Sequence, residues 1–292
     1  MVKFTVVGGD ASSDLAKRIA RRLKAPYVKT ERKVFPDGES KITINHIPKK
    51  SIVVVVQSTY PPVDTNLLEL LSIVSKVQKF SSKIYTVIPY MGYARQDREF
   101  LSGEVVTMKV LAKLFKGAGA SKIIVVDIHS MVGLKYFTIK SKNVTAIPDL
   151  VKYFKKLNLK DPIVISPDQG GKDRAKEFAT EFGLEFIVLD KKRDRKTGKV
   201  QIKTKNIAEV IDRDLILVDD MISTGGSIIN ATQFLKKQKC KRVYVACTHA
   251  LLMNDAEKKI KKAGVTKIVS TNTIPGKTSI VDVSNSISKA IM

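Results

Sequence analysis

The segment Leu215-Ile216-Leu217-Val218-Asp219-Asp220-Met221-Ile222-Ser223-Thr224-Gly225-Gly226-Ser227 joins an apolar strand, two carboxylates, a loop of small residues and the start of a helix. In the loop, short or missing side chains let backbone N–H groups converge on an anion beside a helix N-terminus. Asp219 and Asp220 leave the carboxyl end of the strand, where open α/β sheets bind their ligands. Their oxygens can accept hydrogen bonds from vicinal hydroxyls. The segment therefore predicts a cradle for a sugar phosphate.

The rest of the chain alternates short β-branched runs with amphipathic stretches of helical period. Nearly all-apolar strands in alternating βα units predict parallel sheets covered by helices on both faces, which is a Rossmann-like α/β fold. Strands are expected at 4–7, 52–56, 84–88, 123–126, 163–165, 186–189, 215–218, 243–246 and 267–270, and helices at 13–23, 66–79, 104–115, 149–157, 173–182, 227–237 and 255–262.

Two stretches of the chain are similar to one another. Residues 111–129 and 231–249 each form a helix, a basic turn, a strand and then a histidine, at an offset of 120 positions. The similarity predicts two tandem domains of one fold, 1–145 and 146–292, although such αβ units are common enough to match by chance.

The composition of the chain limits the possible functions but does not decide between them. The 292 residues carry a formal charge of +24, which fits either a nucleic-acid surface or an enzyme for small polyanions. The basic residues are spread through the whole chain, as in a solvated lysine-rich surface, so we expect no nucleic-acid partner. Cys240 and Cys247 do not suggest a disulfide framework, and neither a signal peptide nor a membrane span is expected. We expect a cytoplasmic protein.

Further candidate binding groups lie outside this segment, in both halves of the chain. Phe35-Pro36-Asp37-Gly38-Glu39 offers an aromatic face and two carboxylates, suited to a base, but Pro-Asp-Gly is also a common hairpin turn. Arg95-Gln96-Asp97 follows the strand at 84–88 and places a guanidinium where phosphate would bind. His129 and Asp168 follow two further strands and could hold Mg²⁺, although a lone histidine is more often structural.

Together these motifs resemble the ribose-phosphate pyrophosphokinase family, whose second half resembles a type I phosphoribosyltransferase. The resemblance runs over essentially the whole chain: Phe-Pro-Asp-Gly-Glu at 35–39, Tyr-Ala-Arg-Gln-Asp at 93–97, Asp-Ile-His-Ser at 127–130, Pro-Asp-Gln-Gly-Gly at 167–171, Val218 to Ser227, and Thr-Asn-Thr-Ile-Pro at 271–275. Ser223 stands where the family often has an aspartate, which removes one carboxylate from the sugar loop.

The resemblance implies two phosphoribosyltransferase-like domains, and each motif residue takes a role from it. Phe35, Asp37 and Glu39 would face adenine, Arg95, Gln96 and Asp97 would bind ATP, and His129 and Asp168 would hold Mg²⁺. Asp219 and Asp220 would meet the ribose hydroxyls of ribose 5-phosphate, and Ser223, Thr224, Gly225, Gly226 and Ser227 would bind its phosphate end. A homodimer or larger homo-oligomer is also implied.

A basic stretch at 190–199 follows the strand at 186–189 and is expected to be a mobile loop. Its start resembles the family's catalytic Lys-x-Arg, here Lys191 and Arg193. The implied reaction transfers the β,γ-diphosphoryl group of ATP to the 1-hydroxyl of ribose 5-phosphate and releases AMP. A phosphoribosyltransferase, a non-catalytic regulatory homologue and a nucleic-acid-binding protein are the alternatives.

Overall fold

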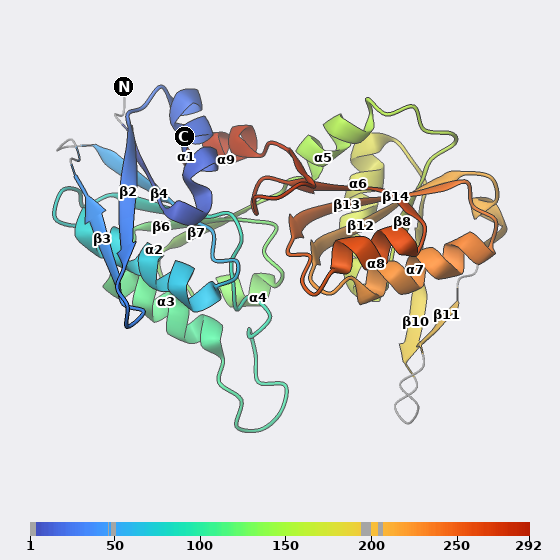
Figure 1. Ribbon diagram of the computed structural model, residues 1–292, viewed down its shortest axis with the longest axis horizontal. Helices are drawn as coiled ribbons and strands as arrows, with labels where there is room; N and C mark the ends of the chain where they lie inside the picture. The colour runs from blue at the N-terminus through green and yellow to red at the C-terminus, as the bar shows by residue number, and fades with distance from the viewer. Residues whose placement is uncertain (1–3, 46, 48–50, 194–199, 204–206) are drawn as a thin grey trace. The chain divides into compact units, whose positions relative to one another are not determined.

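The computed structural model describes residues 4–45, 47, 51–193, 200–203 and 207–292, which form two compact units (Figure 1). The first unit contains residues up to Thr145 together with Thr273–Pro275 and Val283–Met292. The second unit contains Ala146–Asn272 and Gly276–Asp282. The sequence had assigned all of 146–292 to one C-terminal domain, whereas the last helix lies in the first unit. Among the described residues, no helix has the length and apolar character needed to cross a membrane.

The first unit is built on a sheet with the order β3-β2-β1-β4-β5-β6-β7. All its pairs are parallel except β2 with β3, which form an antiparallel hairpin at one edge. Helices α2 and α3 cover one face and α1 and α9 the other (Figure 1). The elements are β1 (Phe4–Gly8), α1 (Ser13–Leu23), β2 (Tyr27–Val34), β3 (Ser40–Ile44), β4 (Ile52–Val56), α2 (Val63–Val77), β5 (Ile84–Ile88), α3 (Thr107–Gly117), β6 (Lys122–Val126), α4 (Met131–Leu134), β7 (Lys140–Val144) and α9 (Ser284–Ile291).

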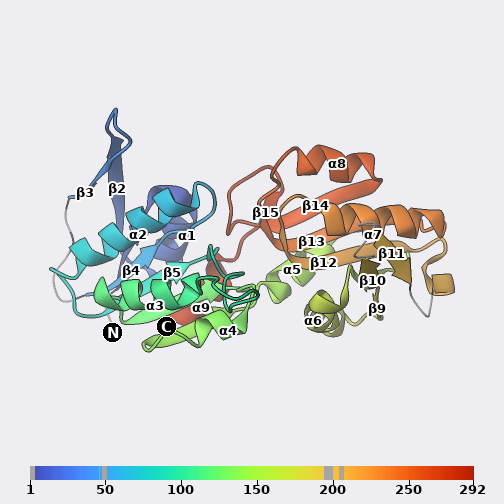
Figure 2. The same ribbon diagram turned by 90° about the horizontal axis from the view of Figure 1, so that it is seen from below.

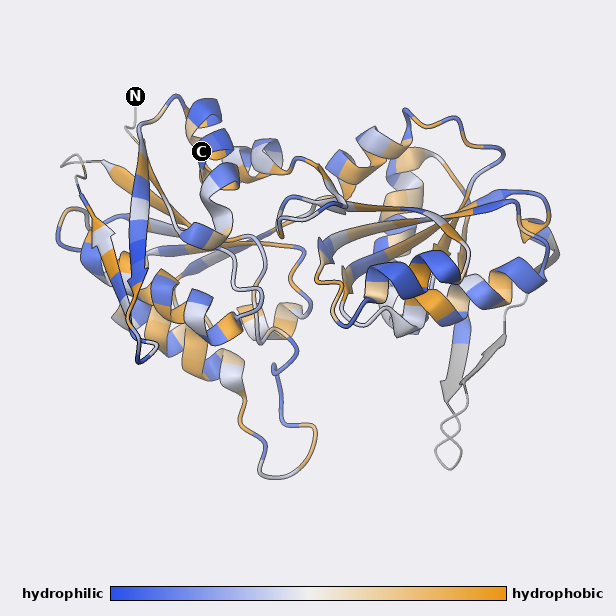
Figure 3. Cartoon of the chain, viewed as in Figure 1, coloured by the Kyte–Doolittle hydropathy of each residue, from blue (hydrophilic) through white to orange (hydrophobic). Residues whose placement is uncertain are grey.

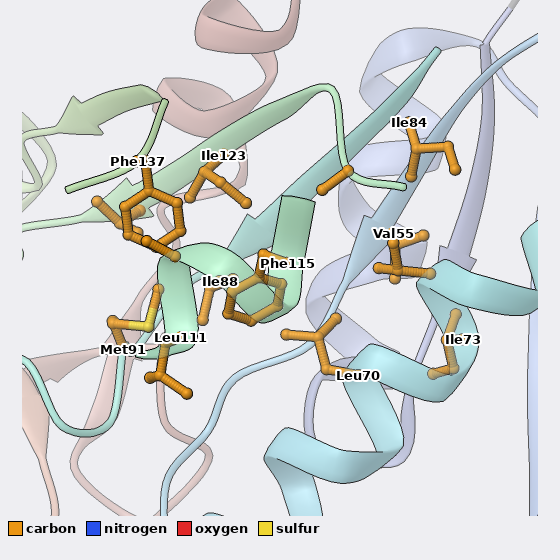
Figure 4. Packing of buried hydrophobic residues seen from close by; sticks show 14 of the residues in the cluster. Val55, Leu70, Ile73, Ile84, Ile88, Met91, Leu111, Phe115, Ile123 and Phe137 are labelled. Carbon is orange, nitrogen blue, oxygen red and sulfur yellow. The ribbon is translucent and has the colours of Figure 1, made fainter. Parts of the chain in front are cut away.

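The core under α2 and α3 shows why these strands are central. Val55, Ile84 and Ile123 come from three neighbouring strands and point toward Leu70 of α2 and Phe115 of α3 (Figure 4). All five side chains are fully buried. Burial of one such side chain stabilises the fold by roughly 1.5–3 kcal/mol. The β-branched runs recognised in the sequence therefore form the rigid part of the unit.

The second unit has a parallel sheet with the order β15-β14-β13-β12-β8-β9. Helices α7 and α8 pack on one face and α5 and α6 on the other, each over its own apolar cluster. In Figure 3, the strands are mostly apolar and α7 and α8 carry polar outer stripes. The elements are α5 (Ile147–Phe154), β8 (Ile163–Ser166), α6 (Lys172–Phe182), β9 (Phe186–Val188), β10 (Asp190–Arg193), β11 (Val200–Lys203), β12 (Asp214–Ile222), α7 (Gly226–Lys237), β13 (Arg242–Ala250), α8 (Ala256–Lys262), β14 (Val265–Thr271) and β15 (Ser279–Val281). Single 3₁₀ turns lie at Gln169–Gly171 and Ile207–Val210 in this unit and at Asp10–Ser12 in the first.

The two units share one topology. Each starts with a strand, a helix and a parallel neighbouring strand, continues into an antiparallel hairpin, and then adds four strands in order across the sheet. By this equivalence β12 corresponds to β4, β13 to β5 and β14 to β6. The α/β fold with mainly parallel sheets is therefore confirmed. The similarity between residues 111–129 and 231–249 was wrong in register, because it aligned β6 with β13, whereas the topology aligns β6 with β14.

Each unit also contains a helix that follows the last strand of the other unit in the sequence. Helix α5 follows β7, the last strand of the first unit, but it packs beside α6 in the second. Helix α9 follows β15 and packs against α1 in the first unit, where the Arg22 side chain donates from Nε to Ser284 Oγ at 2.6 Å. Each unit is therefore completed by a helix whose residues follow the other unit's sheet in the sequence.

Candidate functional site

The loop after β12 has backbone N–H groups that could bind an anion. Within the described part of the chain, the N–H groups of Thr224, Gly225 and Gly226 have no hydrogen-bond acceptor. Thr224 and Gly226 are exposed, and α7 begins at Gly226. N–H groups at the start of a twelve-residue helix carry the positive end of its dipole and favour a bound anion.

The rear of the same loop is packed and fixed. Met253 donates its N–H to Ser223 O at 2.9 Å. Gly225 has a left-handed backbone with φ +79°, and a Cβ there would lie 2.8 Å from Ile260 Cδ1 of α8. Gly226, by contrast, faces open space. Only glycine fits position 225 without strain, so the sequence prediction of a small-residue turn has a steric cause here.

Asp219 and Asp220 are neighbours at the end of β12, and their environments differ. Asp220 is buried, whereas Asp219 is half-buried and accepts the Asp220 N–H at Oδ1 over 2.9 Å. Burial raises the pKa of the Asp219 carboxyl well above its ordinary value, and the nearby Asp220 carboxylate raises it further. A bound group that donates hydrogen bonds or carries positive charge would relieve this repulsion.

One charged neighbour of this pair was missed by the sequence analysis. Arg174, in the first turn of α6, places Nη1 3.6 Å from Asp220 Oδ1. Its position six residues after Asp168, at the helix start, was the available signal. Arg174 lowers the electrostatic cost of holding two carboxylates side by side.

Asp168 lies at the same edge of the sheet, because β8 pairs in parallel with β12 and Asp168 follows β8 by two residues. One of its oxygens, Oδ1, accepts the Gly171 N–H at 3.3 Å. In the part of the chain that the structure describes, its other oxygen has no partner. The structure thus brings Asp168, the aspartate pair and the loop together.

Lys191 and Arg193 lie on β10, which continues from β9 and pairs antiparallel with β11. Leu189, between β9 and β10, donates its N–H to Ser166 O at 3.0 Å, which ties the hairpin's base to β8. The mobile loop was expected over residues 190–199, but Asp190–Arg193 form strand β10 instead, and residues 194–199 lie outside the described residues. The hairpin follows β9, the second strand of its unit, whereas in the first unit the second strand, β2, itself continues into the β2–β3 hairpin.

In the first unit, two predicted ligand-binding segments follow neighbouring strands. Arg95 and Gln96 follow β5, His129 follows the adjacent strand β6, and all three side chains are exposed. Asp97 differs, since it is 2% exposed and both its oxygens are hydrogen-bonded within the protein. It lies in the predicted segment, but its carboxylate faces inward.

Phe35, Asp37 and Glu39 lie on the turn between β2 and β3, and all three are exposed. The turn is closed by the Phe35 N–H, which donates to Glu39 O at 2.8 Å, and by Gly38 at φ +92°. The hairpin projects beyond the sheet (Figure 2). Since β2 is three places from β5 in the strand order, the structure does not bring this turn beside Arg95 within the unit.

The first unit's counterpart of the phosphate loop is the connection between β4 and α2. It contains no glycine and no aspartate before Pro62. Ser58 there donates to Thr273 O at 2.6 Å and accepts the Tyr90 N–H at 3.1 Å. The Ser58 hydroxyl is therefore used within the first unit and is not available to a phosphate.

The fold and the loop define a two-unit protein of the phosphoribosyltransferase class. The phosphoribosyl transferase domain model matches residues 145–284, and the model for the N-terminal domain of ribose phosphate pyrophosphokinase matches residues 4–119.

Full-length comparisons narrow the class. The chain is 38% identical over 291 residues to a ribose-phosphate pyrophosphokinase of Sulfurisphaera tokodaii, covering 98% of this chain and 99% of that protein. It is 36% identical over 277 residues to that of Vibrio cholerae, covering 94% and 88%. The crystal structure of phosphoribosylpyrophosphate synthetase from Mycobacterium smegmatis superposes with a TM-score of 0.87 at 25% identity, covering 99% and 97%. The chain belongs to the ribose-phosphate pyrophosphokinase family and is an enzyme that transfers diphosphoryl groups.

Proposed function

We propose that the second unit binds ribose 5-phosphate. The 1-hydroxyl of this sugar attacks the β-phosphorus of ATP, giving phosphoribosyl pyrophosphate and AMP. The observation that carries this proposal is the row of N–H groups at Thr224, Gly225 and Gly226, which have no acceptor among the described residues and lie at the start of α7. In the proposal the 5-phosphate sits on these amides, with Ser223 and Ser227 at the ends of the loop. Asp219 and Asp220 orient the ribose by accepting from its hydroxyls.

The ATP contacts are assigned to the first unit. Arg95 and Gln96 are exposed at the carboxyl edge of the sheet, which suits contacts to phosphate oxygens. Phe35 presents its ring to solvent and Asp37 and Glu39 flank it, which suits adenine. Because that turn stands apart from Arg95 within the unit, we propose that it serves the site of a neighbouring copy in a homodimer or larger homo-oligomer.

Mg²⁺ is proposed to be held by Asp168 and His129. Among the described residues, no three acidic, imidazole or thiol groups form a metal cage. Such a cage is not required, because Mg²⁺ in phosphoryl-transfer sites takes one or two protein ligands and completes its shell with phosphates and water. The unpartnered oxygen of Asp168 fits this role. When bound, the ion would neutralise phosphate oxygens.

Lys191 and Arg193 are proposed as the catalytic cations. Phosphoryl transfer depends mainly on in-line positioning and on charge stabilisation at the reacting phosphorus and the leaving group. The hairpin's base is fixed to β8 beside Asp168, which supports their approach to the sugar site. We also propose that the enzyme acts in the cytoplasm, where both substrates would be available.

The test is to mix protein, Mg²⁺, ATP and ribose 5-phosphate and follow the products by phosphorus NMR. We expect equal amounts of AMP and phosphoribosyl pyrophosphate. Formation of ADP would indicate a single-phosphoryl kinase. Turnover only with phosphoribosyl pyrophosphate and a base would indicate a phosphoribosyltransferase. No turnover, with ligand binding retained, would indicate a regulatory homologue.

A further inference from the structure

The loop from β5 to α3 contains a buried carboxylate beside two exposed candidate ligands. Arg95 and Gln96 face solvent, but Asp97 is 2% exposed. A buried carboxylate is costly unless each oxygen is paired, so its partners indicate its role.

Asp97 is satisfied entirely from within the first unit. Arg98 donates from Nε to Oδ1 at 3.0 Å and from Nη2 to Oδ2 at 2.7 Å. The Ser130 hydroxyl donates to the same Oδ2, and the Tyr136 hydroxyl donates to the Asp97 carbonyl at 2.7 Å. Chiefly the Arg98 hydrogen bonds lower the pKa of Asp97 to about 2, so the carboxylate stays ionised at neutral pH. These contacts leave little of the carboxylate for a ligand.

The partner Ser130 stands next to His129 and begins helix α4. Its Oγ accepts the Val132 N–H at 3.2 Å, which fixes the helix start, and its hydroxyl hydrogen goes to Asp97. The residue before His129 is also held, because the Ile128 N–H donates to Asn143 Oδ1 at 3.0 Å. The turn carrying His129 is thus tied on one side to β7 and on the other to the loop carrying Arg95 and Gln96.

We propose that Asp97 and Ser130 are positioning residues that hold the His129 turn in register with the Arg95–Gln96 segment, and that Asp97 does not itself contact ATP. This inference rests on the proposed ATP and Mg²⁺ roles of those segments. Misplacement of a binding group by about 1 Å can cost roughly 100-fold in rate, so one hydrogen bond between two loops can affect function without touching substrate.

The test measures MgATP binding by calorimetry without ribose 5-phosphate, and then the turnover rate. We expect Ser130→Ala and Asp97→Asn each to weaken MgATP affinity by about 10-fold, and the double variant to be no weaker than the worse single variant. Non-additivity is expected because both changes break the same link. Ser130→Thr keeps the hydroxyl and should restore most of the affinity.

Asp14→Asn is the matched control, because Asp14 lies in the same unit with a side chain 92% exposed, and it should bind MgATP as the wild type does. Weakened binding in Asp97→Asn with normal binding in Ser130→Ala would mean that Asp97 acts independently of Ser130, and would overturn the proposal. Fully additive losses would overturn it as well. If the wild-type protein binds no MgATP, the proposed function fails instead.

Discussion

Gly225 and Gly226 are adjacent in the phosphate loop, but a methyl group would affect them differently. Gly225→Ala places a Cβ 2.8 Å from Ile260 Cδ1 at a φ of +79°. The left-handed conformation alone costs about 1–2 kcal/mol for a residue with a side chain. We expect this variant to lower the free energy of unfolding by at least that amount, measured by chemical denaturation.

Gly226→Ala is the matched variant. An added Cβ meets nothing within 4 Å, and alanine is a better helix former than glycine. Stability should be unchanged or slightly higher, while the KM for ribose 5-phosphate should rise about 10-fold, equivalent to 1.4 kcal/mol, because the methyl occupies the open side of the loop. An unchanged KM would show that the phosphate approaches from elsewhere.

At the scale of single residues, sequence reasoning predicted the turn after β12 but not the orientation of every side chain around the candidate site. The glycine requirement and the aspartate pair follow from local backbone chemistry, so the loop was predictable. That Asp97 faces inward depends on Ser130 and Tyr136, which are 33 and 39 residues away. Arg174 was missed because its partner Asp220 is 46 positions distant. Contacts of this range are set by packing, which one sequence does not display.

Among the elements, the strands inside the two sheets were predicted except β2, whereas of the edge strands only β9 was predicted and β3, β7 and β15 were not. Continuous apolar runs mark strands buried on both faces, such as β4 and β12. Strand β7 reads Lys-Ser-Lys-Asn-Val and lies at a sheet edge, where polar residues are tolerated. Helix α3 begins at Thr107 rather than at 104. The Met108 N–H donates to Gln96 O and ties the start of the helix to the loop that follows β5.

The β10–β11 hairpin gives a prediction about catalysis. Replacing Lys191 with alanine should lower the rate of AMP formation roughly 100- to 1000-fold if the ammonium stabilises charge in the transition state. The melting temperature should not change. Lys237→Ala, at the exposed end of α7 in the same unit, should retain full activity. A near-normal rate for Lys191→Ala would remove this hairpin from the chemistry.

For the molecule as a whole, the packing of α9 in the first unit predicts which unit a mutation in α9 will destabilise. Ile287 of α9 is fully buried in the first unit, so Ile287→Ala should cost roughly 2–5 kcal/mol. Lys289→Ala, exposed on the same helix, should change stability by less than about 0.5 kcal/mol.

Hydrogen exchange would locate the effect of Ile287→Ala. Faster exchange is expected in α1 and β6, which contact α9, although they lie more than 150 residues earlier in the chain. Faster exchange confined to residues 146–282 would instead place α9 with the second unit and contradict the division described above.

The exchange of helices also bears on how the polypeptide is made. A ribosome adds about 5–20 residues per second, and N-terminal domains usually fold first. Here the sheet of the first unit emerges early, but α9, which covers one of its faces, is translated only after all the strands of the second unit. The nascent chain must therefore carry an unfinished hydrophobic surface until α9 has been made, so termination before α9 would leave the early half aggregation-prone and a target for chaperones and proteases.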